Sequence, residues 1–428
     1  MSKELFEQFR RNLAVKNADA ISKSYRQVTE KLNDKYYGYE SSSKNCRQVG
    51  SYGRNTAVDG VSDLDMVFLL PWDVYYRFQK YENNKQSSLL GEVRAALKEK
   101  FPNRTVRAQQ QVVSIDFSDY IVEVVPAFLN KDGSYTYPDA NNGGAWRVCN
   151  PVAEIDEINE LHKLKNHNLK RLCKMVRAWK NDHGVPMKGM LIDTLCYQFF
   201  NNTIKYDTKT YSSYGEMTKD FFAYIVSIDQ EKEEWRAPGS GSIVTNSGNF
   251  HPKAKKALRR LQEALDNPES AHEKWSIVFG EHFPEYIDEE QRQAIAESKI
   301  KYFEEFAGKK FRLDIQYSLE VDCTVKNEGG RLRGLMARAG VYKIPVHRDL
   351  TFYVSKIDVP GDFKLYWKVR NNGKEAVSRD MIRGTIIRDS GARQITEKTS
   401  FEGEHFVECF AVKENVCVAR GRIIVPIQ

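Results

Sequence analysis

The chain has 428 residues, which is enough for two to three domains at about 150 residues each. Its composition, 41% hydrophobic and 29% charged with 13 Pro and 26 Gly, excludes a disordered, collagen-like or disulfide-scaffold protein. The formal net charge of +7 is unevenly placed, because residues 301–428 hold 23 of the 65 Lys and Arg but only 17 of the 58 Asp and Glu. The first 300 residues are therefore nearly neutral, which excludes a uniformly basic protein that coats nucleic acid.

The sequence also indicates where the protein resides. No run approaches the roughly 18 to 20 apolar residues that a membrane span needs, and the N-terminus lacks the apolar core of a signal peptide. The seven cysteines are scattered and odd in number. We therefore expect reduced thiols in a cytoplasmic protein with no membrane partner.

In chain order, the first predicted element is one long amphipathic helix over residues 2–35, which contain no Pro or Gly. A glycine-containing loop follows at residues 45–54, and then a strand buried on both faces at 66–70. The next elements are a helix at 87–101 and two strands joined by a short turn, at 112–117 and 120–128. Helical patterns then predominate, at residues 153–180, from 188 onward, at 252–265 and at 288–306. Short alternating strands separated by Gly-rich turns begin at residue 350.

These patterns predict an α+β protein, with a mixed sheet and a helical lobe followed by a small β-rich domain. We expect four segments: a core with an N-terminal helix, a helical lobe that completes a cleft, a linker and a β-rich domain, at residues 1–150, 151–310, 311–344 and 345–428.

Two aspartates carry the sharpest chemical signal. Asp63 and Asp65 lie two residues apart at the start of the apolar strand, so the period of a strand directs both carboxylates to one face. Two such carboxylates repel each other unless a cation lies between them. Mg²⁺ is the expected ion, because it binds one or two carboxylates together with substrate phosphate oxygens. A pair of ions would suit phosphoryl chemistry, and Mn²⁺ is an alternative.

A third carboxylate is expected from a neighbouring strand. Glu123 lies among β-branched apolar residues, a placement that is unfavourable unless the charge is paired or bound to metal. Asp116 is the competing candidate, although it lies close to an exposed turn. We therefore predict Asp63, Asp65 and Glu123 as catalytic residues and metal ligands.

The loop before these aspartates predicts a phosphate-binding site. Gly50 lets the backbone approach a triphosphate closely, and the Ser51 hydroxyl can donate to its oxygens. Arg54 and Thr56 are expected to add further contacts. The alternative interpretation is a surface turn followed by solvated aspartates.

The motifs at residues 50–56, 62–65 and 124–128 resemble the polymerase-β-like nucleotidyltransferases, and most closely the bacterial relatives of cyclic GMP-AMP synthase, the SMODS family. The resemblance continues over residues 172–180, similar to the helix on which this family places a basic residue over the donor triphosphate. It implies Arg177 as the first phosphate ligand, with Lys180 and Lys174 behind it, and Lys188 as a further contact.

The C-terminal stretches 363–373, 382–384 and 397–409 resemble the small sensor domain that follows such enzymes in bacterial anti-phage operons. Two features depart from the family pattern. Relatives mostly carry Asp where this chain has Glu123, and they often have Ser after a Lys, where this chain has Lys188 followed by Gly189.

The resemblance implies an enzyme that joins NTPs into a cyclic oligonucleotide second messenger for anti-phage (CBASS) signalling. Its partners would be NTP substrates and a separate effector activated by the product. The basic C-terminal domain indicates an anionic regulator. The alternatives are a linear oligonucleotide synthase or RNA-end nucleotidyltransferase, and a catalytically inactive module that senses nucleotides or RNA.

Overall fold

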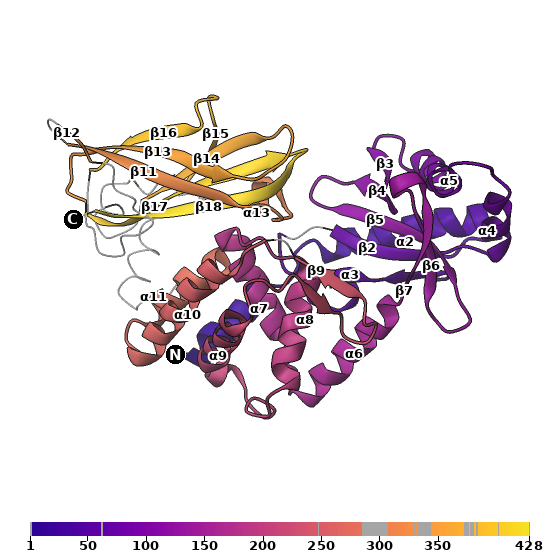
Figure 1. Cartoon of the computed structure of the whole chain (residues 1–428), viewed down its shortest axis with the longest axis horizontal. Helices are drawn as coiled ribbons and strands as arrows, with labels where there is room; N and C mark the ends of the chain where they lie inside the picture. Colours follow the sequence, from indigo (N-terminus) through magenta and orange to yellow (C-terminus); the bar gives the residue numbers. More distant parts are fainter. Residues whose placement is uncertain are drawn as a thin grey trace.

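The structure is a computed structural model that describes residues 2–60, 63–246, 248–284, 307–327, 330–332, 344–371, 376, 381, 384–400 and 402–427. Three parts are visible in Figure 1: a sheet domain on the right, a helical lobe below it and a β-rich C-terminal domain at upper left. The predicted α+β class is therefore confirmed. The helix predicted at residues 288–306 lies outside the described residues.

The sheet domain contains a seven-stranded mixed sheet in which the order β1-β2-β5-β4-β3 is extended by β6 and β7. β2 and β5 are parallel neighbours, whereas β1 and β4 run antiparallel to them. Its elements are β1 (Cys46–Gln48), α2 (Ala18–Tyr37), α3 (Gly50–Gly53), β2 (Asp63–Leu69), α4 (Trp72–Gln79), α5 (Lys85–Lys100), β3 (Val106–Gln109), β4 (Val112–Asp116), β5 (Ile121–Leu129), β6 (Tyr135–Asp139) and β7 (Ala145–Cys149).

The alternation of side chains along β2 explains its central place. Leu64, Met66 and Phe68 point into the main core of the sheet domain, together with apolar side chains of α2 and α5. Val67 on the opposite face is also buried, in a second cluster. The prediction of a strand buried on both faces at residues 66–70 is thus confirmed, and only the start of β2 carries acidic side chains.

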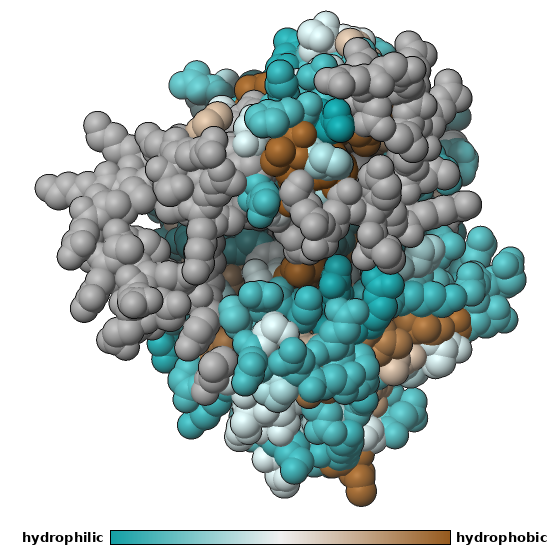
Figure 2. Space-filling model, turned by 90° about the vertical axis from the view of Figure 1, so that its left-hand side faces the viewer, coloured by the Kyte–Doolittle hydropathy of each residue, from teal (hydrophilic) through white to brown (hydrophobic). Residues whose placement is uncertain are grey.

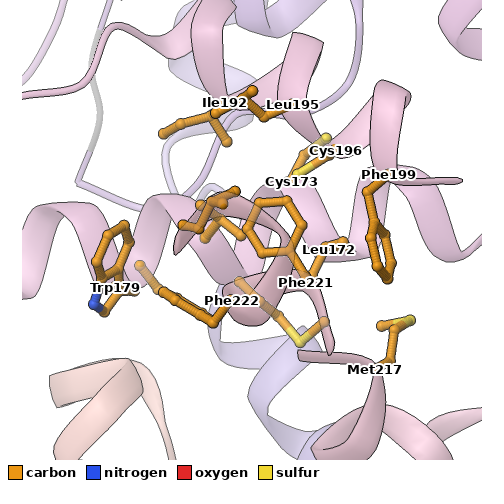
Figure 3. Packing of buried hydrophobic residues seen from close by; sticks show 14 of the residues in the cluster. Leu172, Cys173, Trp179, Ile192, Leu195, Cys196, Phe199, Met217, Phe221 and Phe222 are labelled. Carbon is orange, nitrogen blue, oxygen red and sulfur yellow. The ribbon is translucent and has the colours of Figure 1, made fainter. Parts of the chain in front are cut away.

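The helical lobe is built around one large apolar core that includes residues of α1 and α6–α11. Figure 3 shows part of this core, where the rings of Trp179 and Phe222 meet edge to face at 4.8 Å between centroids. The elements are α1 (Ser2–Asn12), α6 (Pro151–Leu164), α7 (Asn168–His183), α8 (Gly189–Asn201), α9 (Tyr214–Ser227), β8 (Glu234–Arg236), β9 (Ile243–Thr245), α10 (His251–Asp266) and α11 (Ala271–Phe279).

The prediction of one helix over residues 2–35 is wrong, because the structure has two helices, α1 and α2, in its place. Phe6 and Phe9 of α1 pack into the helical lobe, whereas Val28 and Leu32 of α2 pack under the sheet. A single straight helix cannot reach both cores, so tertiary packing breaks the periodic pattern between residues 13 and 17.

The C-terminal domain consists of two sheets packed face to face. The five-stranded sheet has the order β10-β18-β17-β14-β15, and the four-stranded sheet has the order β12-β11-β13-β16. The elements are α13 (Ala307–Lys310), β10 (Arg312–Leu313), β11 (Leu319–Asn327), β12 (Gly330–Leu332), β13 (Asp349–Ile357), β14 (Lys364–Arg370), β15 (Ile386–Arg388), β16 (Gln394–Lys398), β17 (Gly403–Lys413) and β18 (Val416–Ile427).

The predicted linker at residues 311–344 needs correction. β10 and β11 lie inside this range, and each pairs with a strand of one of the two sheets. The β-rich domain therefore begins well before residue 345. The apolar alternation of β11 is hard to recognise in the sequence, because a Gly- and Arg-rich stretch follows it.

Among the described residues, no helix is long and apolar enough to cross a membrane. On the face shown in Figure 2, the coloured surface is mainly hydrophilic, with small separate hydrophobic patches.

Candidate active site

Three acidic residues lie near the start of β2 and β5. The parallel register pairs Asp65 with Glu123, and Asp63 precedes Asp65 by two residues on the same face of β2. All three residues are only partly exposed. Strand register therefore groups the three carboxylates that the sequence predicts as metal ligands.

Burial and mutual repulsion make this cluster unusual. Burial, the charge of Asp314 and the charge of Glu123, in that order, raise the pKa of Asp63 to about 7. Burial and Asp63 raise the pKa of Asp65 to about 7, and burial and Asp65 raise the pKa of Glu123 to about 7. Such a set of oxygen donors favours binding of a divalent cation, which would relieve the repulsion. In the part of the chain that the structure describes, no three potential ligands are already arranged around one point, so an ion would have to draw these carboxylates together.

Asp116, the competing candidate for the third carboxylate, points to different partners. It lies at the end of β4, where its carboxylate is 3.2 Å from Arg107 Nη1 and 3.6 Å from Arg312 Nη1. Two arginines therefore already neutralise it, whereas Glu123 has Asp65 as its strand neighbour. This geometry favours Glu123 as the third member of the cluster.

Gly50 lies directly against Asp65. Its φ of +59° is in the left-handed region, and a Cβ atom added to it would lie 1.8 Å from Asp65 Oδ2. The backbone N–H of Val49 donates to the Asp65 carbonyl at 2.9 Å, which holds the turn against β2. Ser51 follows in α3, and its carbonyl accepts from the Thr56 N–H at 2.8 Å. The predicted phosphate-binding loop thus lies beside the carboxylates, while phosphate binding by Gly50 and Ser51 stays a prediction.

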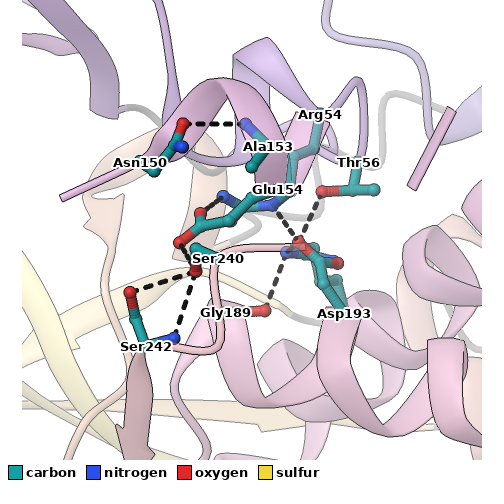
Figure 4. Close-up of polar contacts among 10 residues, drawn as sticks. Arg54, Thr56, Asn150, Ala153, Glu154, Gly189, Asp193, Ser240 and Ser242 are labelled. Carbon is teal, nitrogen blue, oxygen red and sulfur yellow. Dashed lines mark hydrogen bonds and ion pairs between the residues drawn. The ribbon is translucent and has the colours of Figure 1, made fainter. Parts of the chain in front are cut away.

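Arg54, Thr56 and Arg177 lie in a different setting from the one expected. All three donate to the buried carboxylate of Asp193 on α8, as Figure 4 shows for the labelled Arg54 and Thr56. The contacts are 2.8 Å from Arg54 Nε, 3.0 Å from Thr56 Oγ1, and 2.5 and 2.8 Å from Arg177 Nη1 and Nη2.

In this arrangement the three side chains donate to Asp193, and phosphate binding by them stays a prediction. Burial opposes ionisation of Asp193, but Arg177 and Arg54 hold its pKa down to about 2. Arg54 also lies 3.4 Å from Glu154 of α6. The side chains therefore join the loop after α3 to helices α6, α7 and α8. These contacts hold the loop in place.

The two predicted lysines differ from each other. Lys180, near the end of α7, is only 8% exposed; burial lowers its pKa to about 8, while Asp314 and Asp63 act in the opposite direction. Of the two lysines, Lys180 is the one whose charge acts on Asp63. Lys188 is exposed before α8, where its Nζ donates to Thr245 Oγ1 at 3.2 Å.

Sequence reasoning missed two acidic residues, Asp193 and Asp314. Asp193 lies within residues 190–196, where every neighbour is apolar or Thr, which is the same signal that singled out Glu123. Asp314 comes from the C-terminal domain, one residue after β10, and no pattern in the sequence connects it with Asp63.

Comparison with known protein families identifies two domains in this chain. Residues 1–161 match the family model of the Second Messenger Oligonucleotide or Dinucleotide Synthetase (SMODS) domain. Residues 301–428 match the Adenylyl/Guanylyl and SMODS C-terminal sensor domain. A comparison with curated protein sequences gave no match.

Solved structures give the same fold. CdnC of E. coli MS115-1 with ATP is 15% identical with a TM-score of 0.50, covering 67% of this chain and 99% of CdnC. The CdnC:HORMA-deltaN complex gives 17% identity, a TM-score of 0.50 and the same coverage. Vibrio cholerae DncV in its apo form is 17% identical with a TM-score of 0.46, covering 66% of this chain and 87% of DncV. At this identity, the CdnC structures support the fold alone.

Taken together, the fold, the carboxylate pair on β2 and the matched domains define a nucleotidyltransferase. Residues 1–161 form a SMODS domain, and residues 301–428 form the C-terminal sensor domain that is associated with it. The resemblance inferred from the motifs around Gly50, Asp63 and Val124 is thereby confirmed.

Proposed function

We propose that this protein is a Mg²⁺-dependent nucleotidyltransferase that makes a cyclic oligonucleotide second messenger from NTPs in bacterial anti-phage (CBASS) signalling. The observation that carries the proposal is the in-register pair of Asp65 and Glu123, with Asp63 on the same face and Gly50 against Asp65. The cyclic product is inferred from the SMODS family, whose description names oligonucleotide and dinucleotide synthesis.

In this proposal, Asp63, Asp65 and Glu123 hold two Mg²⁺ ions, with Mn²⁺ as an alternative. When bound, the ions make the attacking ribose hydroxyl more acidic and neutralise the leaving pyrophosphate. The hydroxyl oxygen attacks the α-phosphorus of an NTP, the bond to the bridging oxygen of pyrophosphate breaks, and the hydroxyl proton is released. Glu123 helps to activate this hydroxyl.

The other residues bind and orient the substrate. Gly50 permits close approach of the backbone, and the Ser51 hydroxyl donates to a phosphate oxygen. Lys180 supplies positive charge next to the carboxylates, and Lys188 contacts phosphate from the surface. Arg54, Thr56 and Arg177 act as positioning residues through Asp193. We place the NTP cleft between the sheet domain (residues 1–150) and the helical lobe (residues 151–310).

The experiment is incubation of the full chain with four NTPs and Mg²⁺, followed by mass spectrometry of the products before and after phosphatase treatment. Phosphatase-resistant product from NTPs alone is expected, and Asp63→Asn should abolish it. A product that needs an RNA primer would establish the linear alternative. Absence of pyrophosphate release, with no change in Asp63→Ala, would leave only a binding module.

We also propose the setting in which this activity operates. The protein is expected in the cytoplasm, where its product activates a separate effector. An anionic regulator is expected at the C-terminal domain, which holds a cavity of about 230 Å³ whose lining includes Phe352, Val425 and Lys398. A nucleotide suits this lining, because its base can pack on the apolar side chains while Lys398 meets its phosphate. Calorimetric titration of the full chain with nucleotides and RNA tests this, and absence of binding would contradict it.

A further inference from the structure

The β8–β9 hairpin is a feature of the helical lobe to which the proposed function gives no role. It pairs Trp235 with Val244 in antiparallel register, and both side chains are buried. Its tip, residues 237–242, is closed by the Ala237 N–H, which donates to the Ser242 carbonyl at 2.9 Å. The hairpin packs on α8, and Figure 1 shows it beside that helix, on the side nearer the sheet domain.

The tip of the hairpin lies against the first turn of α6. Gly239 has a φ of +72°, and a Cβ atom added to it would lie 2.1 Å from the Ala153 carbonyl oxygen. The next residue, Ser240, donates from Oγ to Glu154 Oε1 at 2.9 Å, and Glu154 Oε2 lies 3.4 Å from Arg54 Nη1. Figure 4 shows this row of contacts. The tip therefore reaches Arg54 through a single carboxylate.

The other end of the hairpin holds the residue that precedes α8. Thr245 Oγ1, at the end of β9, accepts from Lys188 Nζ at 3.2 Å. The buried Asn246 side chain accepts from the Lys188 backbone N–H at 3.2 Å. Its amide group also donates to the Pro186 and Gly248 carbonyls, at 3.1 and 2.7 Å. Both the main chain and the side chain of Lys188 are thus fixed by the end of the hairpin.

The two groups that the hairpin holds belong to different parts of the protein. Arg54 follows α3 in the sheet domain, and its backbone N–H donates to the Gly50 carbonyl at 3.1 Å. Lys188 begins α8 in the helical lobe. The side chains of Arg54 and Glu154 are only 6% and 14% exposed, so their charge-assisted contact is weakly screened by solvent. The hairpin therefore sets the position of the Gly50 loop relative to Lys188.

We infer that the β8–β9 hairpin is a positioning element of the nucleotide site, with Ser240 and Asn246 as its positioning residues. Ser240 acts on the Gly50 loop through Glu154, and Asn246 acts on Lys188. This inference rests on the proposed function, in which the loop and Lys188 bind phosphate. Phosphate contacts of this kind exist before and during the reaction, so their loss raises KM and leaves kcat unchanged. A hairpin that merely stabilises the lobe would lower Tm without a change in KM.

The test measures kcat and KM for ATP from pyrophosphate release by variants of the full chain at saturating Mg²⁺. Ser240→Ala should raise KM by about three- to tenfold, within what one hydrogen bond to a charged group contributes, at unchanged kcat. Ser240→Thr keeps the hydroxyl and should retain the wild-type KM. Ser242→Ala is the matched control, because it removes a hydroxyl of the same tip that contacts Ser240 at 3.0 Å, and it should leave KM unchanged.

Double variants test whether each positioning residue acts through the group assigned to it. Ser240→Ala should add nothing to the KM of Glu154→Ala, and Asn246→Ala should add nothing to that of Lys188→Gln. Additive effects would overturn the inference, and so would an unchanged KM in folded Ser240→Ala and Asn246→Ala proteins. If the folded wild type releases no pyrophosphate from any NTP, the proposed function fails. The affinity of the same variants for ATP, measured by calorimetric titration, then decides the role of the hairpin.

Discussion

The close approach of Gly50 to Asp65 allows a prediction that distinguishes two effects of a substitution. One is backbone strain, which lowers stability, and the other is displacement of the Asp65 carboxylate, which lowers activity. Alanine at position 50 has to adopt a φ near +59°, which costs about 1–2 kcal/mol for a residue with a Cβ. Its Cβ would also lie 1.8 Å from Oδ2 and 2.6 Å from Cγ of Asp65. The Asp65 backbone is held by Val49 and by β5, so its side chain has to rotate away.

Gly38→Ala is the matched control for Gly50→Ala. Gly38 has a φ of +69° and ends α2, and a Cβ there would meet no atom within 4 Å. Both variants should therefore lose about 1–2 kcal/mol of unfolding free energy in chemical denaturation. Only Gly50→Ala displaces a carboxylate of the site, and a displacement of about 1 Å typically costs about 100-fold in rate.

The assay for this pair is Mg²⁺-dependent pyrophosphate release, with each variant kept below its own unfolding transition. Gly38→Ala should retain the wild-type rate, and Gly50→Ala should lose about 100-fold while it remains folded. A Gly50→Ala rate within about threefold of the Gly38→Ala rate would refute the reasoning, because it would mean that Asp65 does not act from its observed position.

Three further predictions follow from the charged groups. Asp193→Asn leaves Arg54 and Arg177 buried without their partner charge, so denaturant titration should show a loss of about 3–5 kcal/mol, and a loss under about 1 kcal/mol would contradict the network. Glu123→Gln should lower the rate of pyrophosphate release by about 100-fold, whereas Asp116→Asn should not lower it; the reverse order would make Asp116 the third carboxylate. Because burial and repulsion raise the pKa values of Asp63, Asp65 and Glu123 to about 7, the folded metal-free protein binds more protons than the unfolded chain between about pH 4 and 7. The stability of the metal-free protein should therefore fall as pH rises through that window. Differential scanning fluorimetry should show that Mg²⁺ raises Tm more at pH 8 than at pH 6. Equal gains in Tm at both pH values would argue against metal binding by these groups.

The acidic cluster could be predicted from the sequence because each of its members carries a local signal. Asp63 and Asp65 occur at strand spacing before an apolar run, and Glu123 is a charge inside an apolar strand. The register that pairs Asp65 with Glu123 could not be predicted, since it joins strands that are more than 50 residues apart along the chain. Local pattern thus identified the residues, and tertiary pairing brings them together.

The phosphate-binding predictions for Arg54, Thr56 and Arg177 depended on a partner that the sequence does not reveal. A basic side chain near a Gly-Ser loop is predicted to bind phosphate when the sequence shows no nearby carboxylate that could accept its hydrogen bonds. Asp193 is that acceptor, 139 residues from Arg54 along the chain, and it is buried with three donors around it. Non-local hydrogen bonds of this kind decide whether a cation faces substrate or the interior.

The break between α1 and α2 has a similar cause. The sequence between them has no Pro or Gly, so its periodic pattern predicts a continuous helix. In the folded protein, the Leu13 carbonyl accepts from the Asp59 N–H at 3.2 Å, and Lys16 pairs with Asp59 at 2.6 Å. The first of these contacts, with the segment before β2, satisfies a backbone carbonyl that a continuous helix would use internally. Packing on two cores therefore outweighs local propensity.

The uneven net charge acquires a structural meaning from the domain interface. Arg312, Arg420 and Arg422 belong to the basic C-terminal domain, and each pairs with an acidic group of the nearly neutral first 300 residues, Asp116 or Asp182. Part of the positive excess therefore serves docking.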